Sequence, residues 1–487
     1  MRRLYRRRRL AAVALASPFA AACLPGNPMV DTATTSASST TATESESATG
    51  GGEGLFGCSG ASCTFVVVSQ TLDDRVDVFG VEGDSHLRAR ISLDLKPDPS
   101  GLQVAGNLLD EPYGIDVHGD ELRVLVGHYP DTERGSLLRL PETLFSGVEA
   151  GSVIGTSEFF DGVDFVAGAR GVELERREAI FALPHSSGKM IVGVFANDLR
   201  AIEWPNASEL LIVDPTAEGG AEIGAFDLGG LDVPCQGAWG MVAVDDSTKP
   251  GRVGLACDGS DSVAILDLPD LSNMTATDAA GAISGCGVKL LDGGWTTRFL
   301  APDGAGGVLA IQSQLVSGPR FWRIGGSCGA APASESVGDD FGALRVLSEA
   351  VLVEGGSDPT WLVAGGVPST GIYVVRGADP QLCGRVGGLD GAFTPAGGSA
   401  NAPYALALAD DGVHLAIGSG PPSNPESAEG RGQVHWATLD TSSSDACEIV
   451  ATELVELTKE LFVDTDPNTW MRAPNVLKIV ERMGDGA

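Results

Sequence analysis

The chain has 487 residues, of which 43% are hydrophobic and 20% charged, with 66 glycines and 27 prolines. This composition favours an all-β domain of many short strands and turns. The formal net charge of −33 argues against a nucleic-acid-binding surface, because phosphate binding depends on Lys and Arg. The acidic surface is expected mainly to keep a secreted protein soluble, although it also permits attraction of Ca²⁺ or basic partners.

The first 22 residues have the order of a bacterial secretion signal. Six arginines lie within residues 1–9, a largely apolar run follows at 10–19, and small residues precede Cys23. The run is too short for a stable membrane span, so residues 1–22 are predicted to be a signal peptide. The ending AAAC resembles the lipobox of bacterial lipoproteins, although a leucine or valine is usual where Ala20 stands. The resemblance implies that Cys23 is lipidated and becomes the first residue of the mature chain.

Leu24 follows Cys23, in place of the aspartate that retains lipoproteins of enteric bacteria in the inner membrane. By the same resemblance, the protein is expected to be secreted across the inner membrane and lipid-anchored in the outer membrane. Loss of the signal's six arginines leaves 26 basic against 65 acidic residues, a net charge of −39. Contact with the membrane is therefore expected through the N-terminal lipid only.

Residues 23–57 are predicted to be a flexible tether. The stretch 32–54 consists of Thr, Ser, Ala, Gly and Glu, and it offers almost nothing to bury. Such a segment cannot offset its conformational entropy by forming a core, so we expect it to be disordered.

One pattern recurs seven times from residue 65 onward: an apolar strand, a small polar turn and a second apolar strand. Equivalent residues of the first strand are Val66, Val124, Phe181, Gly254, Leu309, Leu362 and Ala416. Spacings of 53 to 73 residues indicate a repeat array, and four short strands per repeat indicate a propeller. We predict an all-β, seven-bladed β-propeller over residues 58–466, with six or eight blades as alternatives.

Several copies follow a short strand led by an aromatic residue, which is expected to be the innermost strand of its blade. The leading residues are Tyr113, Trp239, Trp295 and Tyr404, and Arg170 is assigned the equivalent place. The first copy has no such strand, so residues 459–464 are predicted to supply it and close the ring.

Residues 467–487 are predicted to be a C-terminal extension that ends in a short helix docked on the propeller. The apolar residues near helical spacing are Val476, Leu477, Ile479, Val480 and Met483.

The unit CDGSDSVAILDL, which begins at Cys257, resembles the YVTN-type β-propeller repeat. The segments PYGIDV and PYALALADDG are similar to that repeat's leading strand and its Asp-Gly turn. The lipobox, tether and Gly- and Asp-rich propeller together are similar to poorly characterised lipoproteins of myxobacteria. These resemblances imply a fold and a location, and they name no substrate.

Eight cysteines remain if Cys23 carries lipid, and in an oxidising compartment they predict four disulfides. Pairing of neighbours is one of about 105 connectivities. It would join Cys58 to Cys63, Cys235 to Cys257, Cys286 to Cys328, and Cys383 to Cys447.

The mouth of the central channel is the predicted ligand site. The candidate residues are Tyr113, Arg170, Trp239, Trp295, Arg298 and Tyr404. Aromatic faces with a guanidinium suit a sugar, a peptide or an aromatic ligand. The alternative is that each aromatic packs between blades as part of the repeat.

No catalytic residue and no metal site is predicted. His128, His185 and Asp258 share one repeat position, but equivalent places in adjacent blades are expected to lie too far apart for one ion.

Lactonase-type propellers use Ca²⁺ with Glu, Asn and Asp at the channel, and Glu111, Asp116 and Asn401 would be the candidates in this chain. We therefore predict a cell-envelope lipoprotein whose propeller is a binding or scaffold module for an unknown ligand or protein partner, with no cofactor. A Ca²⁺-dependent lactonase-like hydrolase is the alternative, and a purely structural envelope protein is the third possibility.

Overall fold

The computed structural model describes most of the chain beyond residue 54, and all described residues belong to one compact unit, residues 52–487. The described ranges are 55–58, 61–70, 75–83, 86–93, 109–129, 135–142, 152–154, 160–161, 164–165, 170–173, 179–194, 208–217, 221–290, 296–313, 319–326, 335–336, 347–353, 358–365, 370–393, 401–420, 432–442, 447–459 and 474–483. The predicted signal peptide, Cys23 and nearly all of the tether lie outside them.

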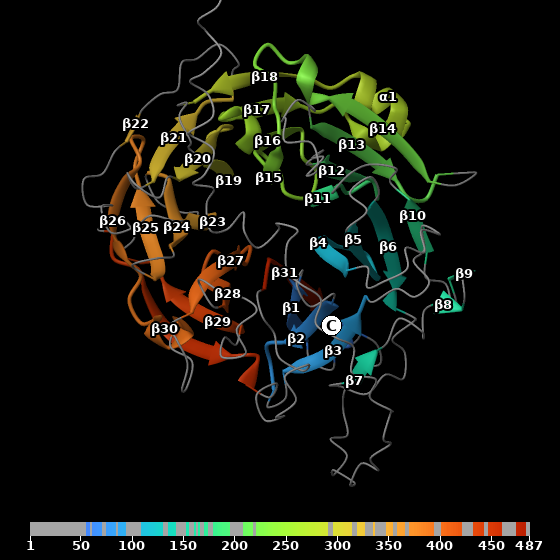
Figure 1. Ribbon diagram of the computed structural model, residues 1–487. Coiled ribbons are helices and arrows are strands. Elements are labelled where there is room, and N and C mark those ends of the chain that lie inside the picture. Colours follow the sequence, from blue (N-terminus) through green and yellow to red (C-terminus); the bar gives the residue numbers. More distant parts are fainter. Residues whose placement is uncertain are drawn as a thin grey trace, which may run out of the picture. The chain divides into compact units, whose positions relative to one another are not determined.

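Seven sheets of mainly antiparallel strands form a ring (Figure 1). Each innermost strand contacts the innermost strand of the next blade, and the contact of β31 with β4 closes the ring. The chain is therefore an all-β, seven-bladed β-propeller, and this prediction is confirmed.

In the first three blades the strands follow one another outward from the axis. Blade 1 contains β31 (Val476–Met483), β1 (Ser62–Gln70), β2 (Arg75–Gly80), β3 (Leu87–Ser92) and β7 (Ser152–Ile154), the last of which is parallel to β3. Blade 2 contains β4 (Leu109–His118), β5 (Glu121–Tyr129), β6 (Gly135–Pro141) and β10 (Arg170–Glu173). Blade 3 contains β11 (Ala179–Pro184), β12 (Met190–Val194), β13 (Glu209–Asp214) and β14 (Glu222–Asp227).

The remaining four blades have the same order. Blade 4 contains β15 (Ala238–Ala243), β16 (Arg252–Cys257), β17 (Ser262–Asp267) and β18 (Ser284–Lys289). Blade 5 contains β19 (Thr296–Pro302), β20 (Val308–Ser313), β21 (Arg320–Ile324) and β22 (Glu335–Ser336). Blade 6 contains β23 (Leu347–Val353), β24 (Thr360–Gly365), β25 (Gly371–Arg376) and β26 (Gln381–Arg385). Blade 7 contains β27 (Ala402–Leu408), β28 (His414–Gly420), β29 (Gln433–Asp440) and β30 (Val450–Glu456).

Few elements lie outside the blades. They are the two-stranded sheet β8 (Phe160–Asp161) and β9 (Asp164–Phe165), the α-helix α1 (Ala276–Gly281), and the 3₁₀ helices η5 (Leu228–Gly230), η6 (Asp258–Ser260), η7 (Leu271–Asn273) and η9 (Asp390–Phe393). α1 packs against β14, where Gly224 has no room for a Cβ beside Ala276 (Figure 1). No helix in the described part of the chain is long and apolar enough to cross a membrane.

Each interface between neighbouring blades contains its own cluster of buried apolar side chains. In β1, Phe65 and Val67 belong to the cluster shared with blade 2, whereas Val66 and Val68 belong to the cluster shared with blade 7. Successive side chains of a strand point to opposite faces, so a strand covered on both sides is apolar at consecutive positions.

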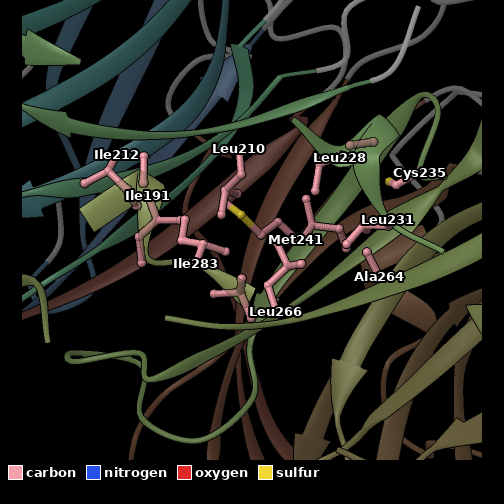
Figure 2. Close-up of a cluster of buried hydrophobic side chains, with 14 of the residues drawn as sticks. Ile191, Leu210, Ile212, Leu228, Leu231, Cys235, Met241, Ala264, Leu266 and Ile283 are labelled. Atoms are coloured by element: carbon pink, nitrogen blue, oxygen red, sulfur yellow. The ribbon is translucent and has the colours of Figure 1, made fainter. Parts of the chain in front are cut away.

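The interface between blades 3 and 4 connects this packing to the axis. Figure 2 shows Met241 of β15 among Leu210, Leu231 and Leu266, which come from both blades and from the loop between them. Met241 also lines the cavity on the axis. Packing between blades therefore fixes the wall of the central cavity.

The predicted C-terminal helix is wrong. Residues 476–483 form β31, which pairs with β1 from Ser69↔Val476 to Ser62↔Met483. As a strand, the segment places Leu477 and Ile479 against blade 7 and Val476 and Val480 against blade 2. The segment therefore belongs to blade 1 rather than to an extension beyond the propeller.

Closure of the ring from the C-terminal side does occur, but the predicted segment was wrong. Residues 459–464 were expected to supply the innermost strand of blade 1, and β31 occupies that place. Of the earlier candidate, only Lys459 lies within the described residues, and it follows the end of β30.

The strand assignment of blade 3 was also wrong by one strand. Phe181 lies in the innermost strand β11, and the second strand is β12, which contains Val192. Arg170 begins β10, which pairs with β6 as the outermost strand of blade 2. Consecutive short apolar strands of one blade look alike in sequence. The innermost strand of blade 3 has Ile180 where blades 2, 4 and 7 have an aromatic residue, so the strands of this blade were assigned one place too far along.

Three of the predicted disulfides are present: Cys58–Cys63, Cys235–Cys257 and Cys383–Cys447. Cys286 is also disulfide-bonded, and its predicted partner Cys328 lies outside the described residues. Disulfides are typical of proteins of an oxidising, extracytoplasmic compartment.

The pairing of β31 with β1 generates a first testable expectation. Val480→Asp should lower the free energy of unfolding by about 3 kcal/mol, because the side chain is only 8% exposed and a carboxylate would be buried without a partner. Met483→Asp, on the same strand but 74% exposed, should change it by less than about 0.5 kcal/mol. Urea unfolding of both variants measures the difference. Equal effects would show that β31 does not close blade 1 in solution.

Candidate functional site

A cavity of about 200 Å³ lies on the axis of the propeller. All seven innermost strands contribute to its wall, with Gly114, Phe181, Gly240, Phe299, Glu349, Leu406 and Leu477 as one residue from each. For comparison, an apolar cavity of about 150 Å³ is large enough for benzene. The site therefore has room for one small organic molecule.

A β-bulge recurs in six innermost strands, those of blades 2 to 7. At each bulge the innermost strand has one residue more than the second strand with which it pairs. The bulged positions are the pair Tyr113–Gly114 and the single residues Ile180, Trp239, Arg298, Ser348 and Tyr404. β31 pairs with β1 without a shift. Bulges turn the side chains that follow them. In blades 2 to 6 the residue directly after the bulge lines the cavity, and in blade 7 the second residue, Leu406, does so.

Four of the predicted ligand residues share this bulge position: Tyr113, Trp239, Arg298 and Tyr404. The side chains of the three aromatics are half-buried, and burial raises the pKa of Tyr404 to about 12. The side chain of Arg298 lies outside the described part of the structure. The structure thus places the four residues at one level of the ring, and their role in binding stays a prediction.

The other two predicted ligand residues differ. Trp295 lies outside the described residues, directly before β19. Arg170 was expected at the channel mouth, but it lies in the outermost strand of blade 2 and pairs with Arg139. Its assignment to the channel was therefore wrong.

Glu349 of β23 is the one ionisable side chain among the described residues that line the cavity. It directly follows the bulge at Ser348. The residues that follow the bulge in the other five strands are Ile115, Phe181, Gly240, Phe299 and Ala405. Glu349 therefore departs from an otherwise apolar or glycine position.

The environment of Glu349 changes its acidity. The side chain keeps some accessible surface because it borders the cavity, but protein surrounds it. Loss of solvent raises the pKa of Glu349 to about 8, and a hydrogen bond from the backbone N–H of Ala350 only partly opposes this. No cation of the described chain contributes to this pKa. At neutral pH the carboxyl is thus mostly protonated, and it can donate a hydrogen bond or release its proton when a positive charge arrives.

The sequence pattern did not reveal Glu349. In the segment LSEAVLV, a single acidic residue resembles the exposed position of an alternating strand. Glu349 becomes distinct only when the innermost strands are aligned on their bulges, which the structure shows and the sequence does not.

The residues considered for Ca²⁺ are not gathered at the cavity. Asp116 of β4 is buried, with its Oδ2 3.9 Å from Nη1 of Arg123, and burial raises the pKa of Asp116. The amide of Asn401, before β27, donates to Oε1 of Gln433 at 3.3 Å. β31 lies between β4 and β27 in the ring, and the side chain of Glu111 is outside the described residues.

The histidine set is also dispersed. His185 follows β11 and its Nδ1 lies 2.7 Å from Oγ of Ser187, whereas Asp258 follows β16. The side chain of His128 lies outside the described residues. Within the described residues, no group of three or more His, Cys, Asp or Glu side chains is placed to hold a metal ion.

Comparison with known proteins identifies the fold. No protein-family model and no curated protein sequence matches the chain. A candidate 6-phosphogluconolactonase from Bacteroides fragilis aligns with a TM-score of 0.51 and 10% identity, over 86% of this chain and 98% of that one. A protein from Lactobacillus plantarum aligns with a TM-score of 0.50 and 11% identity, over 86% and 99%.

The periplasmic gluconolactonase of Pseudomonas aeruginosa aligns with a TM-score of 0.45 and 12% identity, over 86% of this chain and 99% of that one. At these identities the likeness is one of fold alone.

The raised pKa of Glu349 predicts a pH-dependent change in stability. An unfolded glutamate ionises near pH 4.5, whereas the folded one keeps its proton to about pH 8. Stability should therefore fall as pH rises through this interval. Glu349→Gln cannot ionise, so it should match the parent near pH 4 and be more stable by a few kcal/mol at pH 9.

Thermal unfolding between pH 4 and pH 9 measures the effect, and the exposed Glu448→Gln serves as the matched control. Parallel curves for the parent and Glu349→Gln would show that Glu349 is solvated in the folded protein.

Proposed function

We propose that this protein is an extracytoplasmic binding protein whose axial cavity holds one small, largely apolar ligand. Glu349 is the observation that carries the proposal. The other five bulged strands show that the position accepts a glycine or an apolar residue, and an ionisable group there reduces stability above pH 4.5. Perturbed groups in cavities are typical of functional sites, since a merely structural position gains nothing from them.

The wall of the cavity supports an apolar ligand. Phe181, Phe299 and Met241 supply aromatic and thioether surface from three different blades. Such walls bind by excluding water, and one polar group fixes the orientation of the ligand. Tyr113, Trp239 and Tyr404, one step along the same strands, are proposed as the mouth through which the ligand enters.

The proposed location follows from the N-terminal segment and the disulfides. The signal-like residues 1–22 and the lipobox-like ending support lipidation of Cys23. Three disulfides within the propeller support an oxidising compartment. We propose that residues 23–57 tether the propeller to the outer membrane, where it binds a ligand or a protein partner.

A second candidate function is that of a lactonase-like hydrolase. It is favoured by the carboxyl of Glu349, which is protonated at neutral pH and could transfer its proton to a leaving oxygen. The fold of the Bacteroides fragilis protein is compatible with this candidate. Release of acid from gluconolactone or from an aliphatic lactone, with and without added Ca²⁺, distinguishes catalysis from binding.

Filling the cavity should abolish binding. Ala182→Phe places a ring in the axial cavity, whereas Ala225→Phe adds the same ring on the exposed strand β14. Calorimetric titration with benzyl alcohol, benzylamine and benzoate should detect 1:1 binding of at least one probe to the parent. We expect at least a tenfold loss in Ala182→Phe and none in Ala225→Phe, with melting temperatures showing that both fold. Equal binding by both variants would contradict the axial site.

Lipidation is tested at Cys23. In a bacterial host that processes lipoproteins, Cys23→Ser should move the protein from the membrane fraction to the soluble extracytoplasmic fraction. The parent should carry acyl chains at its mature N-terminus, which intact-mass spectrometry detects. A parent that is soluble and cleaved elsewhere would contradict the proposed anchor.

A further inference from the structure

One polar side chain faces the axial cavity among the described residues that line it. Among the described lining residues, only Glu349 has a side chain with an oxygen or nitrogen atom. A ligand that fills the cavity therefore meets apolar side chains or the backbone of a glycine on every blade except blade 6. Among these residues, the carboxyl of Glu349 is the one ionisable group that can recognise the ligand.

The surroundings of Glu349 leave its charge without a counterion among the described residues. Three strands pack against β23, namely β19, β24 and β27. β24 carries no ionisable residue, and β27 carries Tyr404, whose pKa is raised to about 12. β19 carries Arg298, whose side chain lies outside the described residues. No cation contributes to the acidity of Glu349 in the described structure.

The presence of a carboxyl at position 349, rather than an amide or a hydroxyl, indicates the charge of the ligand. A neutral hydrogen-bonding ligand would be served by an amide or a hydroxyl side chain without the loss of stability that an ionisable group causes. A carboxyl adds binding energy beyond those groups only when a positive charge reaches it, because ion pairing is strong where water is excluded.

Two further features favour a cation over an anion. Phe181 and Phe299 line the same cavity, and aromatic faces attract ammonium groups. The net charge of −33 also attracts cations and repels anions at long range.

We infer that the axial cavity selects an organic cation, a small primary amine with an apolar body, whose ammonium group pairs with the carboxylate of Glu349. This inference rests on the proposed function and names its ligand class. Below about pH 8 the pairing requires Glu349 to lose its proton, which passes to solvent, while the amine stays protonated. Each bound amine therefore releases about one proton at pH 6 to 7.

The test compares benzylamine with benzyl alcohol, which has the same number of non-hydrogen atoms and no charge. Calorimetric titrations at pH 6, 7 and 8, in two buffers of different ionisation enthalpy, give the affinity and the number of protons released. The association constant of benzylamine should rise about ninefold from pH 6 to pH 7 and about fivefold from pH 7 to pH 8, as the pKa of about 8 requires, and that of benzyl alcohol should not rise.

The variants separate the possible results. Glu349→Gln should remove the preference for benzylamine over benzyl alcohol together with its proton release, whereas the exposed Glu448→Gln should keep both. If benzylamine does not bind, but benzyl alcohol binds to the parent and Ala182→Phe abolishes that binding, the preference for a cation is contradicted and the axial binding site is supported. If benzylamine binds without proton release, its partner is not Glu349 and the inference is overturned. If neither probe binds, the proposed function fails with it.

Discussion

The fold depends on the fact that every blade is apolar on both faces. Within β1, Phe65 and Val67 cover one neighbour while Val66 and Val68 cover the other. A blade with a single neighbour would leave one such face in water, which is unfavourable in proportion to the exposed apolar area. Only a closed ring removes every free face, and β31 completes the ring by pairing along β1 and contacting β4.

The candidate site is a consequence of the same closure. Seven innermost strands meet around an axis, and the recurrent bulges direct the residues that follow them toward the space they enclose. Packing between blades holds this wall in place. Met241, for example, belongs both to the apolar cluster between blades 3 and 4 and to the lining of the cavity. The rigidity of the interfaces allows the protein to keep Glu349 in a poorly solvated position that lowers stability at neutral pH and above.

The sequence was sufficient for the fold because its signal is repeated: short apolar strands at regular spacing, with cysteines that pair with their nearest neighbours. Residues 476–480 were wrongly predicted to be helical because their apolar spacing fits both a helix and a strand. They form a strand because β1 needs a partner on its inner edge. Arg170 was wrongly assigned to an innermost strand because the sequence does not distinguish a short outermost strand from a short innermost one. Glu349 could not be found because only three-dimensional closure distinguishes a residue on the axis from one on the surface.

The contact of β1 with β31 unites positions such as Val66 and Ile479, which lie near opposite ends of the polypeptide. Bringing distant segments together carries a large entropic barrier and is slow. During synthesis, β1 emerges hundreds of residues before its partner, with an unsatisfied backbone edge. The molecule can therefore reach its native state only after almost the entire chain has been synthesised.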